Sequence, residues 1–93
     1  DIGFHRAIAV TAGNRILLGV FEATAPAVRR SFSMSQRGRR ARGQGSEHTV
    51  LAHQRILDCI AAGDVAGAEA AMRVHLTDAA RDMRAAGEAP AGP

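Results

Sequence analysis

With 93 residues, of which 46% are hydrophobic, the chain has room for one small domain with a packed core. Its single cysteine, Cys59, excludes a disulfide framework, and no apolar run approaches the roughly 18 residues of a membrane span. The formal net charge of +3 hides an uneven distribution, because six of the twelve basic residues lie between Arg29 and Arg42. The basic character is therefore local. No signal peptide is visible, so we expect a cytoplasmic protein without a membrane partner.

The pattern of apolar residues predicts an all-α fold, because Val, Ile and Thr never alternate with polar residues as they do in strands. Apolar residues at helical spacing predict a first helix that ends near Gly13, a residue that suits the left-handed position after a helix. Asn14 fits the N-cap of a second helix, whose apolar stripe continues to Val28. Pro26 lies inside that stripe, so we expect a kink or a break near Ala25.

An arginine-rich segment follows the second helix. Residues 35–45 consist mainly of Gly, Gln, Ser and Arg. Such a segment buries too little apolar area to offset the entropy lost on ordering, so we expect a solvated loop. It lacks the interleaved aromatic residues and the Gly-rich phosphate loop that are typical of a nucleic-acid interface.

Two more helices are predicted beyond this loop. Ser46 suits the N-cap of the third helix, Gly63 its end, and Asp64 the N-cap of the fourth helix. A two-residue connection makes the third and fourth helices antiparallel neighbours. We expect the helical domain to span residues 1–86, followed by a disordered tail over residues 87–93 that contains two Pro and two Gly.

Four side chains with metal-binding groups fall at compatible positions in this arrangement. Asp1 and His5 are four residues apart and share a helix face, while His53 and His75 lie on the inward stripes of the third and fourth helices. Burying three imidazoles and a carboxylate without partners would cost several kcal/mol. A shared divalent ion would satisfy them, as would a polar, water-filled pocket. Nitrogen and oxygen ligands favour zinc, with nickel or manganese as alternatives.

The sequence gives weaker evidence for a functional role of three further polar residues. His48 lies about 140° around the helix from His53, so we expect it to be exposed on another face. Arg6 is a candidate effector-binding residue because a guanidinium binds a carboxylate through two hydrogen bonds. Asn14 is a second candidate, although a helix-capping role explains it better, and Arg6 would suit a solvent-facing position equally well.

Taken together, the motifs resemble those of one known family. They are D-x-x-F-H, A-G-N, H-x-x-I-L-D-x-I-x-x-G-D and A-x-x-x-M-x-x-H-L. The combination is similar to the C-terminal effector-binding (FCD) domain of GntR-superfamily, FadR-subfamily transcription regulators, over residues 1–83. The resemblance implies the last four helices of an antiparallel bundle of six or seven. It also implies that a divalent metal is held by an Asp and three His, here Asp1, His5, His53 and His75.

The resemblance implies a function as well. Such domains bind a small effector, commonly a carboxylate, and form homodimers, while DNA is bound by an N-terminal winged-helix domain that this sequence does not contain. We therefore expect a ligand-sensing and dimerisation domain of a bacterial transcription regulator, not an enzyme. Two alternatives stay open. One is a metal-dependent, hydrolase-like enzyme, for which no general base is evident near the ligands. The other is a metal-free helical interaction module.

Overall fold

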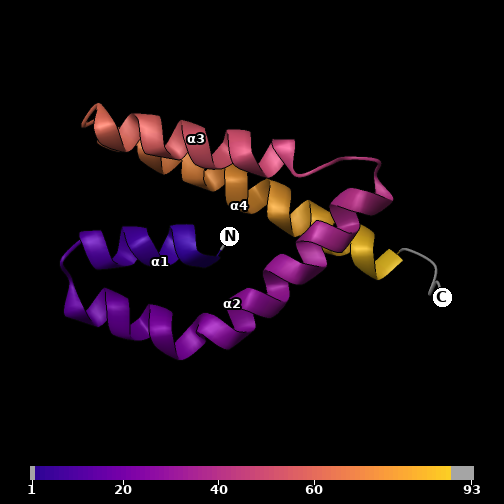
Figure 1. The fold of residues 1–93 in the computed structure, drawn as a ribbon, viewed down its shortest axis with the longest axis horizontal. Helices are drawn as coiled ribbons and strands as arrows, with labels where there is room; N and C mark the ends of the chain where they lie inside the picture. The colour runs from indigo at the N-terminus through magenta and orange to yellow at the C-terminus, as the bar shows by residue number, and fades with distance from the viewer. Residues whose placement is uncertain (1, 89–93) are drawn as a thin grey trace. The chain divides into compact units, whose positions relative to one another are not determined.

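The computed structural model describes residues 2–88, and every element in that range is an α-helix (Figure 1). The all-α prediction is therefore confirmed. None of the described helices is long and apolar enough to cross a membrane. The four helices are α1 (Ile2–Thr11), α2 (Arg15–Ala41), α3 (Glu47–Ala61) and α4 (Val65–Glu88).

The described residues form two compact units, which divide within α2 between Ser33 and Met34. The first unit contains α1 and most of α2. The second contains the last turns of α2 together with α3 and α4. Of the tail predicted over residues 87–93, the first two residues end α4, and the rest lie outside the described residues.

Local signals in the sequence set the helix ends of the first unit. Gly13 follows α1 with a φ of 69°, the left-handed conformation that glycine adopts without strain. The side-chain oxygen of Asn14 accepts hydrogen bonds from the backbone N–H groups of Ile16 and Leu17, each at 3.0 Å. The predicted helix end and N-cap are thus confirmed. Of the two outcomes predicted at Pro26, the break near Ala25 is wrong, because α2 remains helical through Pro26, and the kink stays a prediction.

The loop predicted over residues 35–45 is wrong for its first seven residues, which are helical and end α2. Three of them, Ser35, Gly38 and Arg39, are buried. Gly38 lies so close to α4 that an added Cβ atom would overlap the backbone carbonyl of Asp82. Packing against α4 therefore orders a segment whose composition alone favours a loop. Only residues 42–46 connect α2 to α3.

The second unit is built around α3 and α4, which lie side by side in opposite directions (Figure 1). Gly63 ends α3 with a φ of 69°, and the Asp64 carboxylate accepts a hydrogen bond from the Gly67 N–H at 2.9 Å. Both predictions are confirmed. Ser46 precedes α3, but its side chain makes no capping hydrogen bond. Its φ of −70° and ψ of −16° are already helical, whereas a capping residue is normally extended.

The interior of the described chain is small and partly polar. Its buried hydrophobic residues are Ala9, Ile56 and Ala79. Larger apolar residues of α3 and α4, including Leu57 and Leu76, are roughly half exposed at 47% and 49%. The buried positions of α4 instead carry polar groups next to Ala79, and these groups define the candidate site.

Candidate metal centre

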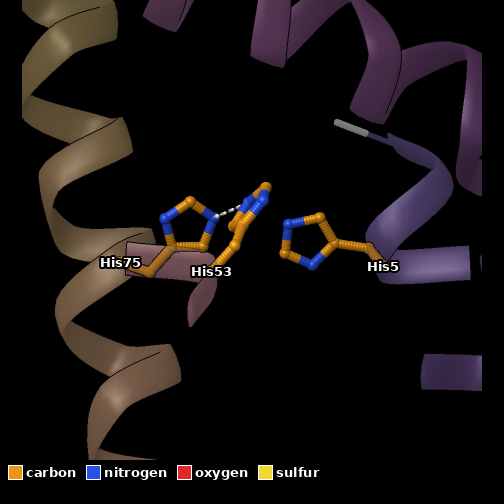
Figure 2. Close-up of side chains that lie close together, drawn as sticks. All are labelled: His5, His53 and His75. Atoms are coloured by element: carbon orange, nitrogen blue, oxygen red, sulfur yellow. Dashed lines mark hydrogen bonds between the residues drawn. The ribbon is translucent and has the colours of Figure 1, made fainter. Parts of the chain in front are cut away.

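The central feature of the second unit is a pair of histidines that face each other across α3 and α4. His53 Nε2 lies 3.2 Å from His75 Nε2, and the two rings meet edge to face with centroids 4.7 Å apart (Figure 2). His53 precedes Gly63 by ten residues, and His75 follows Asp64 by eleven. At 1.5 Å per residue, both lie about 15–17 Å from the turn. The tight connection therefore places them opposite each other.

Both histidines are held in the neutral form. The pKa of His53 is lowered to about 4, mainly by burial and next by the neighbouring His75, which disfavours a second positive charge. Burial also lowers the pKa of His75, and the guanidinium of Arg39 acts in the same direction, while Asp78 opposes it. A neutral imidazole carries one N–H donor and one nitrogen lone pair. The pair can thus share an N–H···N hydrogen bond or direct both lone pairs at one cation.

The spacing of the two nitrogens fits a shared metal ion. Two imidazole nitrogens bound tetrahedrally at about 2.0–2.1 Å from zinc are roughly 3.3–3.4 Å apart, and at a right angle they are roughly 2.8–3.0 Å apart. The 3.2 Å between His53 and His75 falls between these values. Neutral, buried imidazoles are also the protonation state that metal coordination requires.

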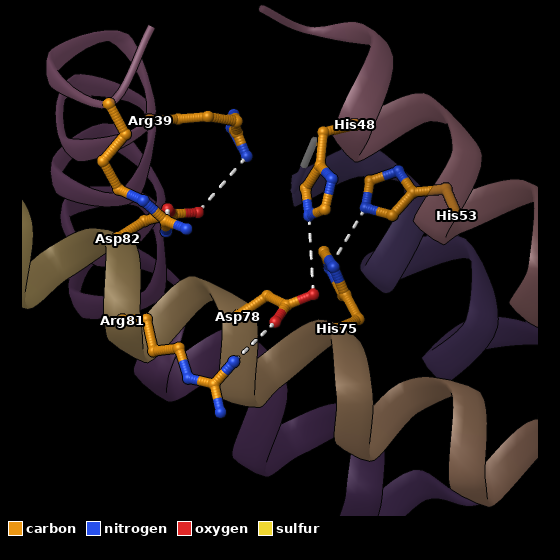
Figure 3. Close-up of polar contacts among 8 residues, drawn as sticks. Arg39, His48, His53, His75, Asp78, Arg81 and Asp82 are labelled. Atoms are coloured by element: carbon orange, nitrogen blue, oxygen red, sulfur yellow. Dashed lines mark hydrogen bonds and ion pairs between the residues drawn. The ribbon is translucent and has the colours of Figure 1, made fainter. Parts of the chain in front are cut away.

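Three polar side chains near the pair contact one another: His48 on α3, and Asp78 and Arg81 on α4. His48 Nε2 lies 3.4 Å from Asp78 Oδ2, and Arg81 approaches the same carboxylate at 3.7 Å (Figure 3). The side chain of His48 is 45% exposed, which agrees with the predicted exposure. Its contact with Asp78 was not predicted. Asp78 follows His75 by one helical turn, so the carboxylate is placed to tune the electrostatics of the histidine pair.

Two buried charged residues were missed by sequence reasoning. Asp82 is only 1% exposed and follows His75 by seven residues, or two turns, along the same stripe. The seven-residue spacing from His75 could have predicted that Asp82 lies on the same buried face of α4. Arg39 is 7% exposed. Nothing in the local sequence predicted this burial, because the composition of its segment predicted a solvated loop.

The remaining predicted site residues lie in the first unit or outside the described range. His5 is half-buried in α1, where its ring lies beside Phe4 and Phe32 with centroid distances of 5.4 and 5.0 Å. Asp1 lies outside the described residues. The structure thus brings two of the four predicted ligands together in one unit, and the convergence of His5 and Asp1 with them stays a prediction.

The two candidate effector-binding residues have structural partners. Arg6 Nε donates to Glu22 Oε1 at 2.6 Å on the exposed surface, and Asn14 caps α2. These contacts explain both side chains without an effector. Their predicted role in effector binding stays a prediction.

Comparison with known proteins identifies the family. The model of the FCD domain family matches residues 1–78, a range that contains both His53 and His75. This chain belongs to the FCD domain family. FCD domains are the C-terminal effector-binding domains of GntR-family regulators, which indicates a ligand-sensing regulatory role. No curated protein and no solved structure matches this FCD domain.

Proposed function

We propose that this FCD domain binds a divalent metal ion and a small carboxylate effector, as the sensing domain of a dimeric, DNA-binding bacterial regulator. The observation that carries the proposal is the His53–His75 pair, in which two neutral imidazoles face each other at 3.2 Å. Membership of the FCD family supports the sensing role. Zinc is the ion expected first, since it readily accepts imidazole ligands.

His5 is proposed as the third ligand and Asp1 as the fourth. Each of these three histidines carries a ring nitrogen of the kind that binds a metal ion. Asp1 and His5 are four residues apart, the spacing that places two side chains on one face of a helix. A carboxylate with three imidazoles is a ligand set that suits zinc, nickel or manganese.

The protein itself holds the two imidazoles in the neutral form, in a fixed orientation and partly shielded from water. When bound, the ion supplies a positive centre to which an effector carboxylate coordinates. Burial keeps the imidazoles unprotonated at neutral pH, and the rigid α3–α4 pair fixes their separation. Effector binding then favours one arrangement of the helices over another, which is how a sensing domain biases attached domains.

Elemental analysis after purification in zinc tests the metal part of the proposal. We expect about one zinc per chain in the wild type, little in His75→Ala, and wild-type content in His48→Ala. His48 is a matched control because it is an exposed histidine on the same helix pair. A wild-type protein without bound metal would support the metal-free interaction module instead.

Calorimetry tests the effector part. A panel of small carboxylates is titrated into metal-loaded and chelator-treated protein. We expect at least one acid to bind, with an affinity that depends on the metal. Steady hydrolysis of esters in the same panel, without tight binding of any acid, would support the enzyme alternative.

A further inference from the structure

An excess of positive charge lies at the end of α2. Four arginines occur within six residues, and no Asp or Glu lies between Glu22 and Glu47. The four are Arg37, Arg39, Arg40 and Arg42. Among the described residues, only Asp82 forms ion pairs with them: Arg42 Nη1 lies 2.6 Å from its Oδ1, and Arg39 Nη1 lies 3.8 Å from its Oδ2. One carboxylate against four guanidinium groups leaves three positive charges in excess.

Three of these arginines are accessible. Arg37 and Arg40 are exposed, and neither makes an ion pair within residues 2–88. They are three residues apart, so they are neighbours on one surface of the helix, with Cβ atoms roughly 5–6 Å apart. The side chain of Arg42 is 43% exposed although it contacts Asp82. We call Arg37, Arg40 and Arg42 the basic end of α2.

Packing on α4 fixes the backbone that carries these side chains. Gly38 lies so close to the Asp82 carbonyl that no side chain fits between the two helices at this point. A cation on a fixed helix loses less entropy on binding an anion than a cation on a solvated loop. The dipole of α2 also favours cations in its last turn, which contains Arg39 and Arg40. Arg37 precedes that turn, so the dipole does not account for it.

The chemistry of the basic end favours a phosphate backbone over a protein partner. Residues 35–46 contain no apolar side chain larger than alanine. The centre of a protein–protein interface is usually apolar and depleted in charge, whereas interfaces with DNA are polar and positively charged. A guanidinium group binds phosphate oxygens through two parallel hydrogen bonds.

The same composition favours duplex DNA over a single strand. Proteins bind single strands largely by stacking bases on aromatic side chains, and residues 35–46 contain none. Sequence-independent binding to a duplex needs only cations, because its affinity comes from neutralising phosphates and releasing counterions. Each strand carries one phosphate per roughly 3.4 Å of helix axis, so long side chains at the spacing of Arg37 and Arg40 reach neighbouring phosphates.

We propose that the basic end of α2 binds the phosphate backbone of duplex DNA without reading its sequence. Arg37 and Arg40 each neutralise one phosphate, and the exposed side of Arg42 neutralises a third. This contact adds affinity and no sequence specificity. It is made by this domain itself and is independent of the histidine pair and of the proposed effector.

Salt-dependent binding of a fluorescent DNA duplex of arbitrary sequence to the 93-residue chain tests the proposal. Anisotropy titrations between about 50 and 200 mM salt give the slope of log K against log salt concentration, which is about −0.9 for each neutralised phosphate. Three contacts give the wild type a slope of about −2.7, and Arg37→Gln/Arg40→Gln should reduce it to about −0.9. At about 0.1 M salt, the loss of two contacts should lower the affinity about ten- to hundredfold.

Two further double variants serve as controls. Arg55→Gln/Arg73→Gln removes the same net charge from exposed positions of α3 and α4, and should keep the wild-type slope. Arg37→Lys/Arg40→Lys keeps both charges and should also keep the slope. Circular dichroism of every variant measures its helix content. Vesicles of equal parts phosphatidylglycerol and phosphatidylcholine test an anionic lipid surface as the other polyanion.

A slope that flattens in Arg37→Gln/Arg40→Gln, and in neither control variant, supports the proposal. Equal flattening in Arg55→Gln/Arg73→Gln overturns it, because net charge is then the whole effect. A flattened slope in the lysine variant at wild-type helix content overturns it as well, since both charges are still present. Failure of the wild type to bind the duplex at the lowest salt, or tighter binding to the vesicles, also overturns it. None of these results bears on the metal content, which tests the proposed function separately.

Discussion

Replacing Gly38 with alanine tests whether close contact between α2 and α4 orders the arginine-rich segment. In an exposed helix, Gly→Ala stabilises by about 1 kcal/mol because alanine has the higher helix propensity. At Gly38, however, the added Cβ would lie 3.0 Å from the Cα atom of Asp82 and would overlap its carbonyl group. These are backbone atoms, so no side-chain rotation relieves the overlap. One of the two helices must move.

The expected change in the free energy of unfolding is the cost of overpacking minus the gain in helix propensity. Overpacking typically costs about 1–3 kcal/mol, and the upper end applies here because the obstacle is backbone. Subtracting the propensity gain leaves a net loss of about 2 kcal/mol. For a domain of this size that loss lowers the melting temperature by roughly 8–16 °C.

Gly19→Ala is the matched control for this experiment. Gly19 lies in the same helix, is exposed, and has no atom within 4 Å of an added Cβ. It should raise the melting temperature in thermal unfolding followed by circular dichroism. The reasoning is refuted if Gly38→Ala is as stabilising as Gly19→Ala, because α2 would then not depend on contact with α4 at this point.

Three further predictions concern the histidine pair and the end of α2. His75→Ala should lower the melting temperature much more in zinc than in chelator, because metal binding to the native state adds to its stability; equal losses would make His75 only a packing residue. In metal-free protein, His53 has a pKa of about 4 when folded, below the 6.5 of an ordinary histidine. The unfolded state therefore binds the proton first, so stability is fully present above about pH 6.5 and falls as the pH drops towards 4. His53→Asn should flatten this dependence in urea titrations at several pH values, and an unchanged slope would contradict the assigned cause. Limited trypsin digestion should cut after Arg42, in the connection to α3, before it cuts after the buried Arg39; early cleavage at Arg39 would show that the last turns of α2 are not held on α4.

The sequence by itself determined the features that depend on neighbouring residues. The Gly13–Asn14 and Gly63–Asp64 pairs marked helix boundaries correctly, because a left-handed glycine and a capping side chain act within one turn. The same local rule placed His53 and His75 opposite each other, since a short connection fixes the register of two antiparallel helices.

Only the tertiary structure decided what depends on contacts between distant segments. The composition of residues 35–41 predicted a loop. These residues are nevertheless helical, and Gly38 among them packs against the backbone of Asp82. That contact buries Arg39 and Asp82, although they are 43 residues apart in sequence. Ser46 resembles a cap in sequence, but its backbone is already helical. In each case the free energy of packing between helices exceeds a local preference of about 1 kcal/mol, and no local pattern reports it.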